Sequence, residues 1–276
     1  AVLALGVNVV IFTGGIDISV GSVVAFTGIV MGKLIVENGM PDIVGVIAAV
    51  LVGAACGTFN GIMISKFKLQ PMIATLAMMS MARGAAYTLA DGQTITGYSA
   101  GFRWIGIANI PGTAIPVQII FMVLLYIVFY YVMKYRKFGR YIYSIGGNEE
   151  ATRLSGINVD KYKTLAYTVS GLCAGIASVI LVAKLNSAQS VAGLDYEMDA
   201  IASCVIGGTS LLGGFGSVWG TFVGSIIMIV IRNGLNLMGA SNDIQYIVIG
   251  AVIILAVTID VFRNKAEARA RKMAAQ

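Results

Sequence analysis

Polar side chains inside apolar stretches are the residues of this sequence that could handle a solute. Several of them lie in two glycine-rich turns, Asp17 to Ser22 and Gly207 to Gly216. The candidates for a polar route are Asp17, Ser19, Ser22, Asn60, Thr209 and Ser210. Histidine is absent, and no paired carboxylates occur inside the apolar segments. Hydroxyls and amides without such groups favour a neutral polyhydroxylated solute over a proton relay.

Asp17 is the most distinctive of these candidates, because it is an acidic residue in a glycine-containing turn between two apolar segments. Its carboxylate could contact the solute directly. It could equally cap the following helix by accepting the backbone amides of Ser19 or Val20. The sequence leaves both interpretations open.

A hydrophilic island from Lys134 to Lys163 is the second place where chemistry can reside. It holds seven basic and three acidic residues and is flanked by apolar runs. Within it, Asn148 is a suitable N-cap, the next two residues are glutamates, and Gly156 can supply a left-handed stop. The pattern predicts a capped helix of about two turns.

One face of this predicted short helix carries Ala151, Leu154 and Ser155, which are spaced three and four residues apart. A small, mildly apolar face of this kind is typical of a helix that docks into a groove on another protein. The alternative is a solvated connection whose basic residues only fix the topology. The loop alone does not decide between them.

The sequence offers no catalytic, cofactor or metal site. It contains no Gly-x-x-x-x-Gly-Lys-Ser/Thr run and no evident pair of nucleophile and base. The cysteines lie inside apolar segments without paired spacing, which predicts neither disulfides nor a metal site: Cys56, Cys173 and Cys204. If transport is uphill, its energy would therefore have to come from a source outside this chain.

Composition places the chain in the membrane. Of its 276 residues, 58% are hydrophobic and 12% charged, and the mean hydropathy is +0.86. A soluble domain carries about twice that fraction of charge. The basic residues gather at the ends of apolar segments, so orientation in a bilayer explains them better than nucleic-acid binding does. The sequence predicts a polytopic all-α membrane bundle.

Nine apolar segments succeed one another: Val2 to Phe12, Val20 to Val36, Ile43 to Ser65, Pro71 to Ala90, Pro116 to Met133, Thr164 to Ala183, Met198 to Gly208, Ser217 to Met238 and Ile244 to Phe262. Six or seven are long enough to cross ~30 Å of hydrocarbon. Met198 to Gly208 is short and ends in glycines, as a re-entrant or discontinuous helix does. We expect about 8–10 transmembrane or re-entrant helices, with an N-terminal helix missing before Ala1.

Basic residues predict the orientation. Three segments hold 14 of the 19: Lys66 to Lys68, the island, and the tail at 263–276. The positive-inside rule places all three in the cytoplasm. Arg83 lies deeper in its segment than lipid exposure allows, so we expect it to face the protein interior or an interface.

Glycine spacing predicts helix packing and a weak internal repeat. Glycines recur every fourth residue at 53, 57 and 61, at 171 and 175, and at 220 and 224. Such stripes let neighbouring helices approach closely. The two glycine turns are each followed by an apolar helix, an acidic turn, a second helix and a basic exit. This order is typical of duplicated transporters, although glycine-rich membrane segments can also resemble each other by chance.

Four stretches of the sequence closely resemble the permease subunits of bacterial ribose-type monosaccharide ABC importers. These are Gly14 to Ser22, Phe138 to Asn158, Asp199 to Ala202 with Ile206 to Leu211, and Asn233 to Leu237. The resemblance covers essentially the whole chain as a single permease domain, residues 1–276. It is specific for the family and weakly specific for the sugar.

The resemblance implies how such a chain works. The permease would be a homodimer in the bacterial inner membrane that receives sugar from a periplasmic or lipid-anchored binding protein and is driven by a cytoplasmic ATPase. Residues 134–163 would be the coupling loop and 263–276 a cytoplasmic tail. Coupling to the ATPase would fall on Glu149, Glu150, Ala151, Arg153, Leu154 and Gly156, although Thr152 replaces the second alanine of the family's Glu-Ala-Ala motif.

Three other functions stay in view: a permease of a branched-chain amino-acid importer, a stand-alone secondary carrier or channel, and a structural scaffold. The stretches 148–158 and 207–211 favour sugar over amino acids, and the coupling motif counts against the scaffold. A secondary carrier would move solute without an ATPase. The identity of the sugar cannot be predicted from the sequence, because contacts to a neutral solute follow no fixed residue spacing in a permease.

Overall fold

The computed structural model describes the backbone of residues 1–274 and all side chains except those of residues 242, 260 and 263–274. All side chains of the predicted tail at 263–276 therefore lie outside the described part of the structure. The elements are α1 Val2–Phe12, α2 Val20–Gly32, the π-helical turn η1 Lys33–Glu37, α3 Asp42–Ser65, α4 Pro71–Ala90, β1 Ile95–Thr96, α5 Ala100–Ile107, α6 Val117–Tyr135, α7 Lys137–Gly147, α8 Glu149–Leu154, α9 Val159–Leu185, β2 Ser187–Ala188, α10 Tyr196–Ile206, α11 Val218–Leu237 and α12 Asn242–Ala274.

All nine apolar segments are helices, which confirms a polytopic all-α membrane bundle. Within the described residues, five helices are both long and apolar enough to cross a membrane: α2 with η1, α3, α6, α9 and α11. By length alone α4 and α12 also qualify, which agrees with the six or seven segments expected to be long enough. α4 is 20 residues long but includes Arg83 and several hydroxyl side chains, and within the described side chains the apolar stretch of α12 runs from Asp243 to Ile259.

The centre of the bundle is formed by α1 and α9. Every residue of α1 is buried. α9 lies against α3 along the predicted glycine stripes, where a Cβ on Gly53 would meet the backbone of Gly171 and a Cβ on Gly57 that of Tyr167. Since no side chain separates the two helices, their backbones are in direct contact. The structural interpretation of these glycines is confirmed.

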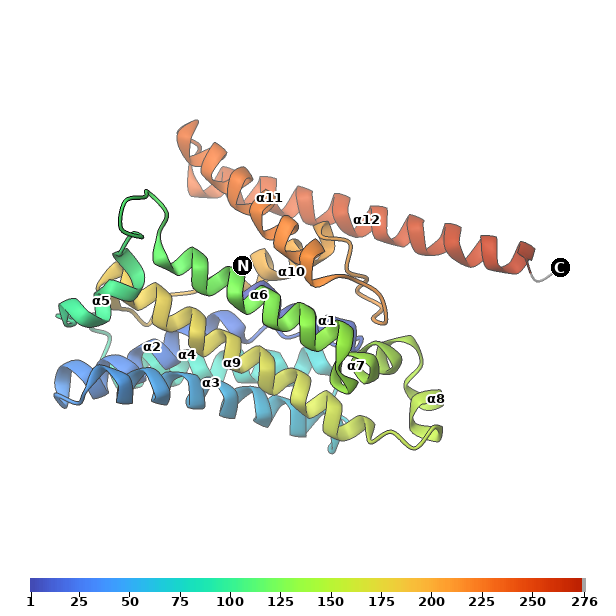
Figure 1. Ribbon diagram of the computed structural model, residues 1–276, viewed down its shortest axis with the longest axis horizontal. Helices are drawn as coiled ribbons and strands as arrows, with labels where there is room; N and C mark the ends of the chain where they lie inside the picture. Colours follow the sequence, from blue (N-terminus) through green and yellow to red (C-terminus); the bar gives the residue numbers. More distant parts are fainter. Residues whose placement is uncertain (275–276) are drawn as a thin grey trace.

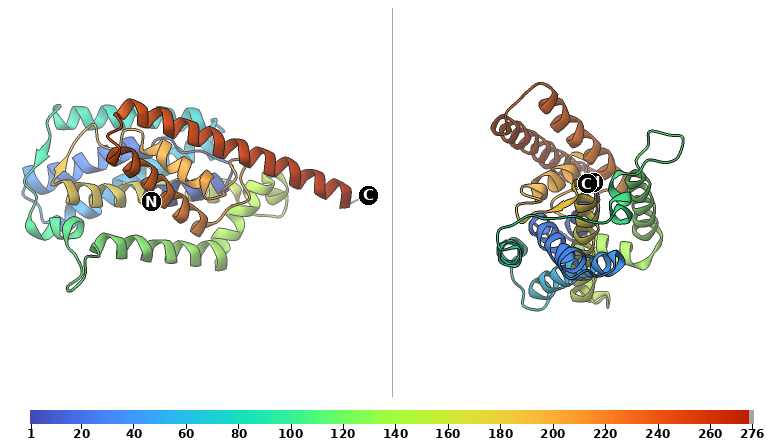
Figure 2. Two further views of the ribbon diagram at one scale, coloured as in Figure 1. Left: turned by 90° about the horizontal axis from the view of Figure 1, so that it is seen from above. Right: turned by 90° about the vertical axis from the view of Figure 1, so that its left-hand side faces the viewer.

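The two ends of the bundle are built from different elements. At one end, β1 pairs with β2, and Arg83 donates to the carbonyls of Ser190 and Ala192 at 2.6 and 2.8 Å. Arg83 thus has protein partners, as expected. At the other end lie α7, α8 and the far end of α12 (Figures 1 and 2), and Lys68 pairs there with Asp160 at 2.9 Å. The three basic segments therefore share one end of the molecule.

Two short helices of equal length precede the two glycine turns. α1 and α10 each have 11 residues, and they are in contact where Cys204 Sγ donates to the carbonyl of Ala4 at 3.3 Å. Each is followed by an irregular turn and then by a helical hairpin, α2–α3 or α11–α12. This shared order supports the internal repeat.

Candidate functional site: an exposed short helix and two buried turns

The hydrophilic island folds into two helices rather than one. α8, Glu149–Leu154, is the predicted short helix, and α7, Lys137–Gly147, precedes it. α7 was not predicted, although its sequence carried a signal. Phe138, Ile142 and Ile145 follow helical spacing, and the two isoleucines are buried. Phe138 packs beside the ring of Tyr162 with 6.3 Å between ring centroids.

The ends of α8 are as predicted. The Asn148 side chain accepts a hydrogen bond from the backbone N–H of Ala151 at 2.9 Å, which is an N-cap. Gly156 has a φ of +82°, in the left-handed region that favours glycine. The hydroxyl of Thr152 donates to the carbonyl of Asn148 at 2.7 Å, and Thr152 is buried. α8 is therefore fixed at both ends and along its inner face.

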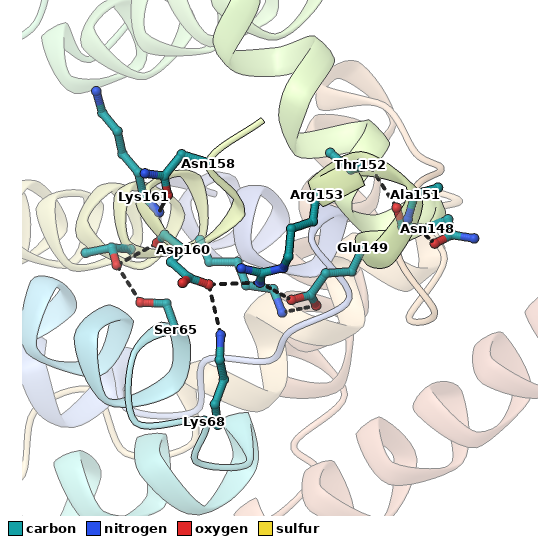
Figure 3. Close-up of polar contacts among 12 residues, drawn as sticks. Ser65, Lys68, Asn148, Glu149, Ala151, Thr152, Arg153, Asn158, Asp160 and Lys161 are labelled. Atoms are coloured by element: carbon teal, nitrogen blue, oxygen red, sulfur yellow. Dashed lines mark hydrogen bonds and ion pairs between the residues drawn. The ribbon is translucent and has the colours of Figure 1, made fainter. Parts of the chain in front are cut away.

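An ion-pair network fixes α8 to the start of α9 and to the α3–α4 turn (Figure 3). Arg153 pairs with Glu149 at 3.2 Å and with Asp160 at 3.0 Å, and Asp160 also accepts from Lys68. Lys163 pairs with Glu149. Single exposed ion pairs are worth about 0–1 kcal/mol, but a network that shares partners restricts geometry more than separate pairs do.

Glu149 is charged at neutral pH. Partial burial by itself would raise the pKa of its carboxyl, but the hydrogen bonds and positive charges of Lys163 and Arg153 outweigh that effect and lower the pKa below its ordinary value. Two of the six residues predicted to couple to the ATPase, Glu149 and Arg153, thus have partners inside the chain. Their role in the described structure is to hold α8 in place.

The other predicted residues of α8 face outward. Glu150, Ala151 and Ser155 are exposed, and Leu154 is 84% exposed. Gly156 is exposed as well, and a Cβ there would meet nothing within 4 Å. An exposed leucine on a helix that is held in place by the ion-pair network is typical of a surface that binds another protein. Docking itself stays a prediction.

The first glycine turn is organised by a buried carboxylate. Asp17 is 1% exposed, and its Oδ1 accepts from the backbone N–H and the hydroxyl of Ser19 at 3.0 and 2.6 Å. Its Oδ2 accepts from the hydroxyl of Ser170 on α9 at 2.7 Å. The amide of Asn60 on α3 donates to Ser19 Oγ at 3.0 Å. Asp17 therefore accepts the backbone amide of Ser19, the residue immediately before α2, as one of the two interpretations expected.

The second glycine turn is also buried. Thr209 donates to Asn8 Oδ1 on α1 at 2.9 Å, and both Thr209 and Ser210 are buried. The structure thus brings Asp17, Ser19 and Asn60 together, places Thr209 and Ser210 in a separate cluster, and buries Ser22 in the first turn of α2.

A cavity of about 490 Å³ lies elsewhere, between α1, α6, α9, α10 and α11, and none of the six predicted pathway residues lines it. Its lining includes Asp199 and Arg232, which pair at 2.8 Å, and Gln118, Lys184 and Ser203. Sequence reasoning did not assign these residues to a site. The available signal was an acid in the first turn of the short α10 and a basic residue near the end of α11.

Comparison with known proteins gives a consistent picture. Residues 1–257 match the family described as "Branched-chain amino acid transport system / permease component". Over 264 residues, the chain is 46% identical to the ribose import permease protein RbsC of Escherichia coli (strain K12), a match that covers 94% of this chain and 81% of that protein.

Two further relatives extend the comparison. The ribose import permease protein RbsC of Bacillus subtilis (strain 168) is 42% identical, with 94% of this chain and 80% of that protein covered. The D-allose transport system permease protein AlsC of Escherichia coli (strain K12) is 36% identical, with 94% and 78% covered. No solved structure matches the chain.

Proposed function

Because the chain belongs to the family of permease components matched over residues 1–257, we propose that it is the transmembrane subunit of an ATP-driven importer of a monosaccharide, ribose or a similar sugar. The observation that carries this proposal is the 46% identity with a ribose import permease over 94% of the chain. The 36% identity with a D-allose permease supports a sugar while leaving the particular sugar open. A branched-chain amino acid, which the family description names, is the second candidate.

We further propose that ATP hydrolysis is carried out by a separate cytoplasmic ATPase that binds α8. The exposed face of Glu150, Ala151, Leu154 and Ser155 supports this, since it offers a docking surface on a helix fixed by the ion-pair network. The proposed orientation follows: the end of the molecule that carries α8 and Lys68 would lie in the cytoplasm of a bacterial cell, below the inner membrane.

At the opposite end, we propose that a periplasmic or lipid-anchored binding protein delivers the sugar. That end carries β1, β2, α5 and the turn after α11. Its loops are poor in basic residues, as expected of loops that cross the membrane during insertion. Selectivity for the sugar would then reside mainly in the binding protein.

A second copy of the chain completes the proposed importer, and the exposed side of α4 supports this. Ala77, Ser80, Gly84 and Thr88 share one face of α4 and are all exposed. α4 is long enough to cross the membrane but is not among the helices apolar enough to count as candidate spans. Small and hydroxyl side chains suit contact with another helix better than contact with lipid.

The proposed route for the sugar runs past the two glycine turns. In the described structure Ser19, Ser22, Thr209 and Ser210 are buried, so the route would open only in another conformation of the importer. Differential binding of ATP to the two conformations would drive the change. Cysteines at these four positions should react with small aqueous thiol reagents in at least one nucleotide state. Failure to react in every state would remove the turns from the route.

The experiment that tests the function is reconstitution. The chain is co-purified with a candidate ATPase, placed in lipid vesicles, and supplied with a panel of binding proteins loaded with ribose, allose or leucine. ATP-dependent uptake of a sugar is the expected result. Uptake of leucine would favour the amino-acid alternative, and uptake without the ATPase would show a secondary carrier.

A further inference from the structure

The last turn of α7 lies directly against the second glycine turn and against the stretch from Phe12 to Gly14, which leads from α1 into the first glycine turn. A Cβ on Gly146 would collide with the carbonyl oxygen of Phe12 and with the backbone N of Gly214. A Cβ on Gly213 would in turn collide with the backbone of Gly14 and of Gly146. Three separate parts of the chain therefore meet through bare backbone. We call the contact formed by Gly14, Gly146, Gly213 and Gly214 the glycine joint.

Hydrogen bonds and one ring contact hold the glycine joint together. The N–H of Gly214 donates to the carbonyl of Phe12 at 3.0 Å, which links the second glycine turn to the end of α1. The hydroxyl of Tyr143 on α7 donates to the carbonyl of Gly216 at 3.2 Å. The rings of Phe12 and Tyr143 lie 4.6 Å apart between centroids. The joint is thus specific as well as close.

The glycine joint is also close in sequence to the exposed docking face. Asn148 alone separates α7 from α8, and it caps α8 while its carbonyl accepts the Thr152 hydroxyl. Because only one residue links the two helices, a displacement of α8 would also move Gly146 and Gly147. Packed backbones with no intervening side chain pass such a displacement on, because close-packed interiors have little compressibility.

We propose that the glycine joint carries the movement of α8 to the two glycine turns, with Gly146 and Tyr143 as the positioning residues of this step. The proposal deepens the function proposed above and rests on it. In the alternative mechanism, the movement of α8 reaches the bundle only through α6 and α9, the helices that precede α7 and follow α8 in the chain. The proposed contact adds a route through space. In this arrangement a single contact reaches both the segment that leads into α2 and the segment that leads into α11.

Gly146 and its neighbour Gly147 provide a matched pair for the test. A Cβ on Gly146 collides with backbone, whereas a Cβ on Gly147 meets nothing within 4 Å. The test uses the full importer in vesicles with the wild-type ATPase and binding protein. It measures sugar taken up per ATP hydrolysed and the amount of ATPase that co-purifies. We expect Gly146→Ala to retain the ATPase but to lower the transport ratio at least tenfold, and Gly147→Ala to stay within twofold of wild type.

Tyr143→Phe is the second variant, because it keeps the ring contact with Phe12 and removes only the hydrogen bond to Gly216. We expect a several-fold lower transport ratio with unchanged co-purification and unchanged basal ATP hydrolysis. A purely structural role would lower the protein yield and leave the ratio intact. If the Gly146→Ala protein does not accumulate, the transport ratio of the Tyr143→Phe variant tests the proposal.

Wild-type ratios in Tyr143→Phe and in any folded Gly146→Ala protein would overturn the proposal while the importer itself still works. A wild-type complex that binds no ATPase or takes up no solute would instead overturn the proposed function, and this inference with it. The two failures are therefore distinguishable in one set of measurements.

Discussion

Gly156 ends α8 in a backbone conformation that side chains rarely adopt. Its φ of +82° is incompatible with proline, whose ring fixes φ near about −65°. Gly156→Pro should therefore distort the exit from α8, abolish co-purification of the ATPase and abolish uptake, while the protein still reaches the membrane. Asparagine tolerates the left-handed region, so Gly156→Asn is the matched control and should retain most uptake. Normal uptake in the proline variant would remove this turn from the mechanism.

Glu150 and Glu149 are neighbours with different roles. Glu149 pairs with Arg153 and Lys163, whereas Glu150 is exposed on the outer side of α8. Exposed substitutions away from special features change stability by about 0.5 kcal/mol or less. Glu150→Lys should therefore leave folding intact and abolish the stimulation of ATP hydrolysis by the loaded binding protein.

Asp243→Lys is the control for Glu150→Lys, because it makes the same change of charge at an exposed position in the first turn of a helix, after the turn that follows α11 at the opposite end of the molecule. We expect it to retain stimulated ATP hydrolysis. Equal stimulation in both variants would show that the outer side of α8 does not contact the ATPase. Equal loss in both would show a general effect of charge.

At the scale of elements, the contact between α3 and α9 sets the spacing of the bundle. A Cβ on Gly57 would collide with the carbonyl of Tyr167, so a larger side chain must push the two helices apart. Overpacking of this kind costs about 1–3 kcal/mol or more. We expect Gly57→Val to lower the thermal unfolding midpoint in detergent by several degrees and to reduce the yield of monodisperse protein.

Gly250→Ala is the control for Gly57→Val, since a Cβ at position 250 on α12 meets nothing within 4 Å. Its unfolding midpoint should match that of the wild type. An unchanged midpoint for Gly57→Val would mean that α3 and α9 separate without cost, contrary to the close contact of their backbones.

At the scale of the whole molecule, the position of α4 decides where the second copy can bind. After Cys56, Cys173 and Cys204 are replaced, Gly84→Cys on the exposed small face of α4 should cross-link two copies in native membranes. Val128→Cys on α6 is exposed on a strongly apolar candidate span and should not cross-link. The readout is the dimer band on a non-reducing gel.

Cross-linking at position 128 in place of 84 would move the interface from α4 to α6 without contradicting a homodimer. Cross-linking at neither position would contradict both placements. The same gel with ATP and without it tests whether the interface changes between nucleotide states.

The sequence by itself determined the class of the molecule and the local structure of α8. The nine apolar segments predicted nine helices, because the hydrophobic pattern of a segment decides whether it can lie in a membrane. The caps of α8 at Asn148 and Gly156 were also predictable, because a cap depends only on residues within one turn of it.

Only the tertiary structure decided which of these local features act together. α7 is stable as a helix because Ile142 and Ile145 are buried against the bundle. The roles of Glu149 and Glu150 differ because only Glu149 pairs with Arg153 and Lys163. The glycine joint unites residues 14, 146 and 213–214, which lie far apart in the sequence. Such contacts depend on which helix faces meet in space, and that is settled by packing of the whole bundle rather than by the local pattern of residues.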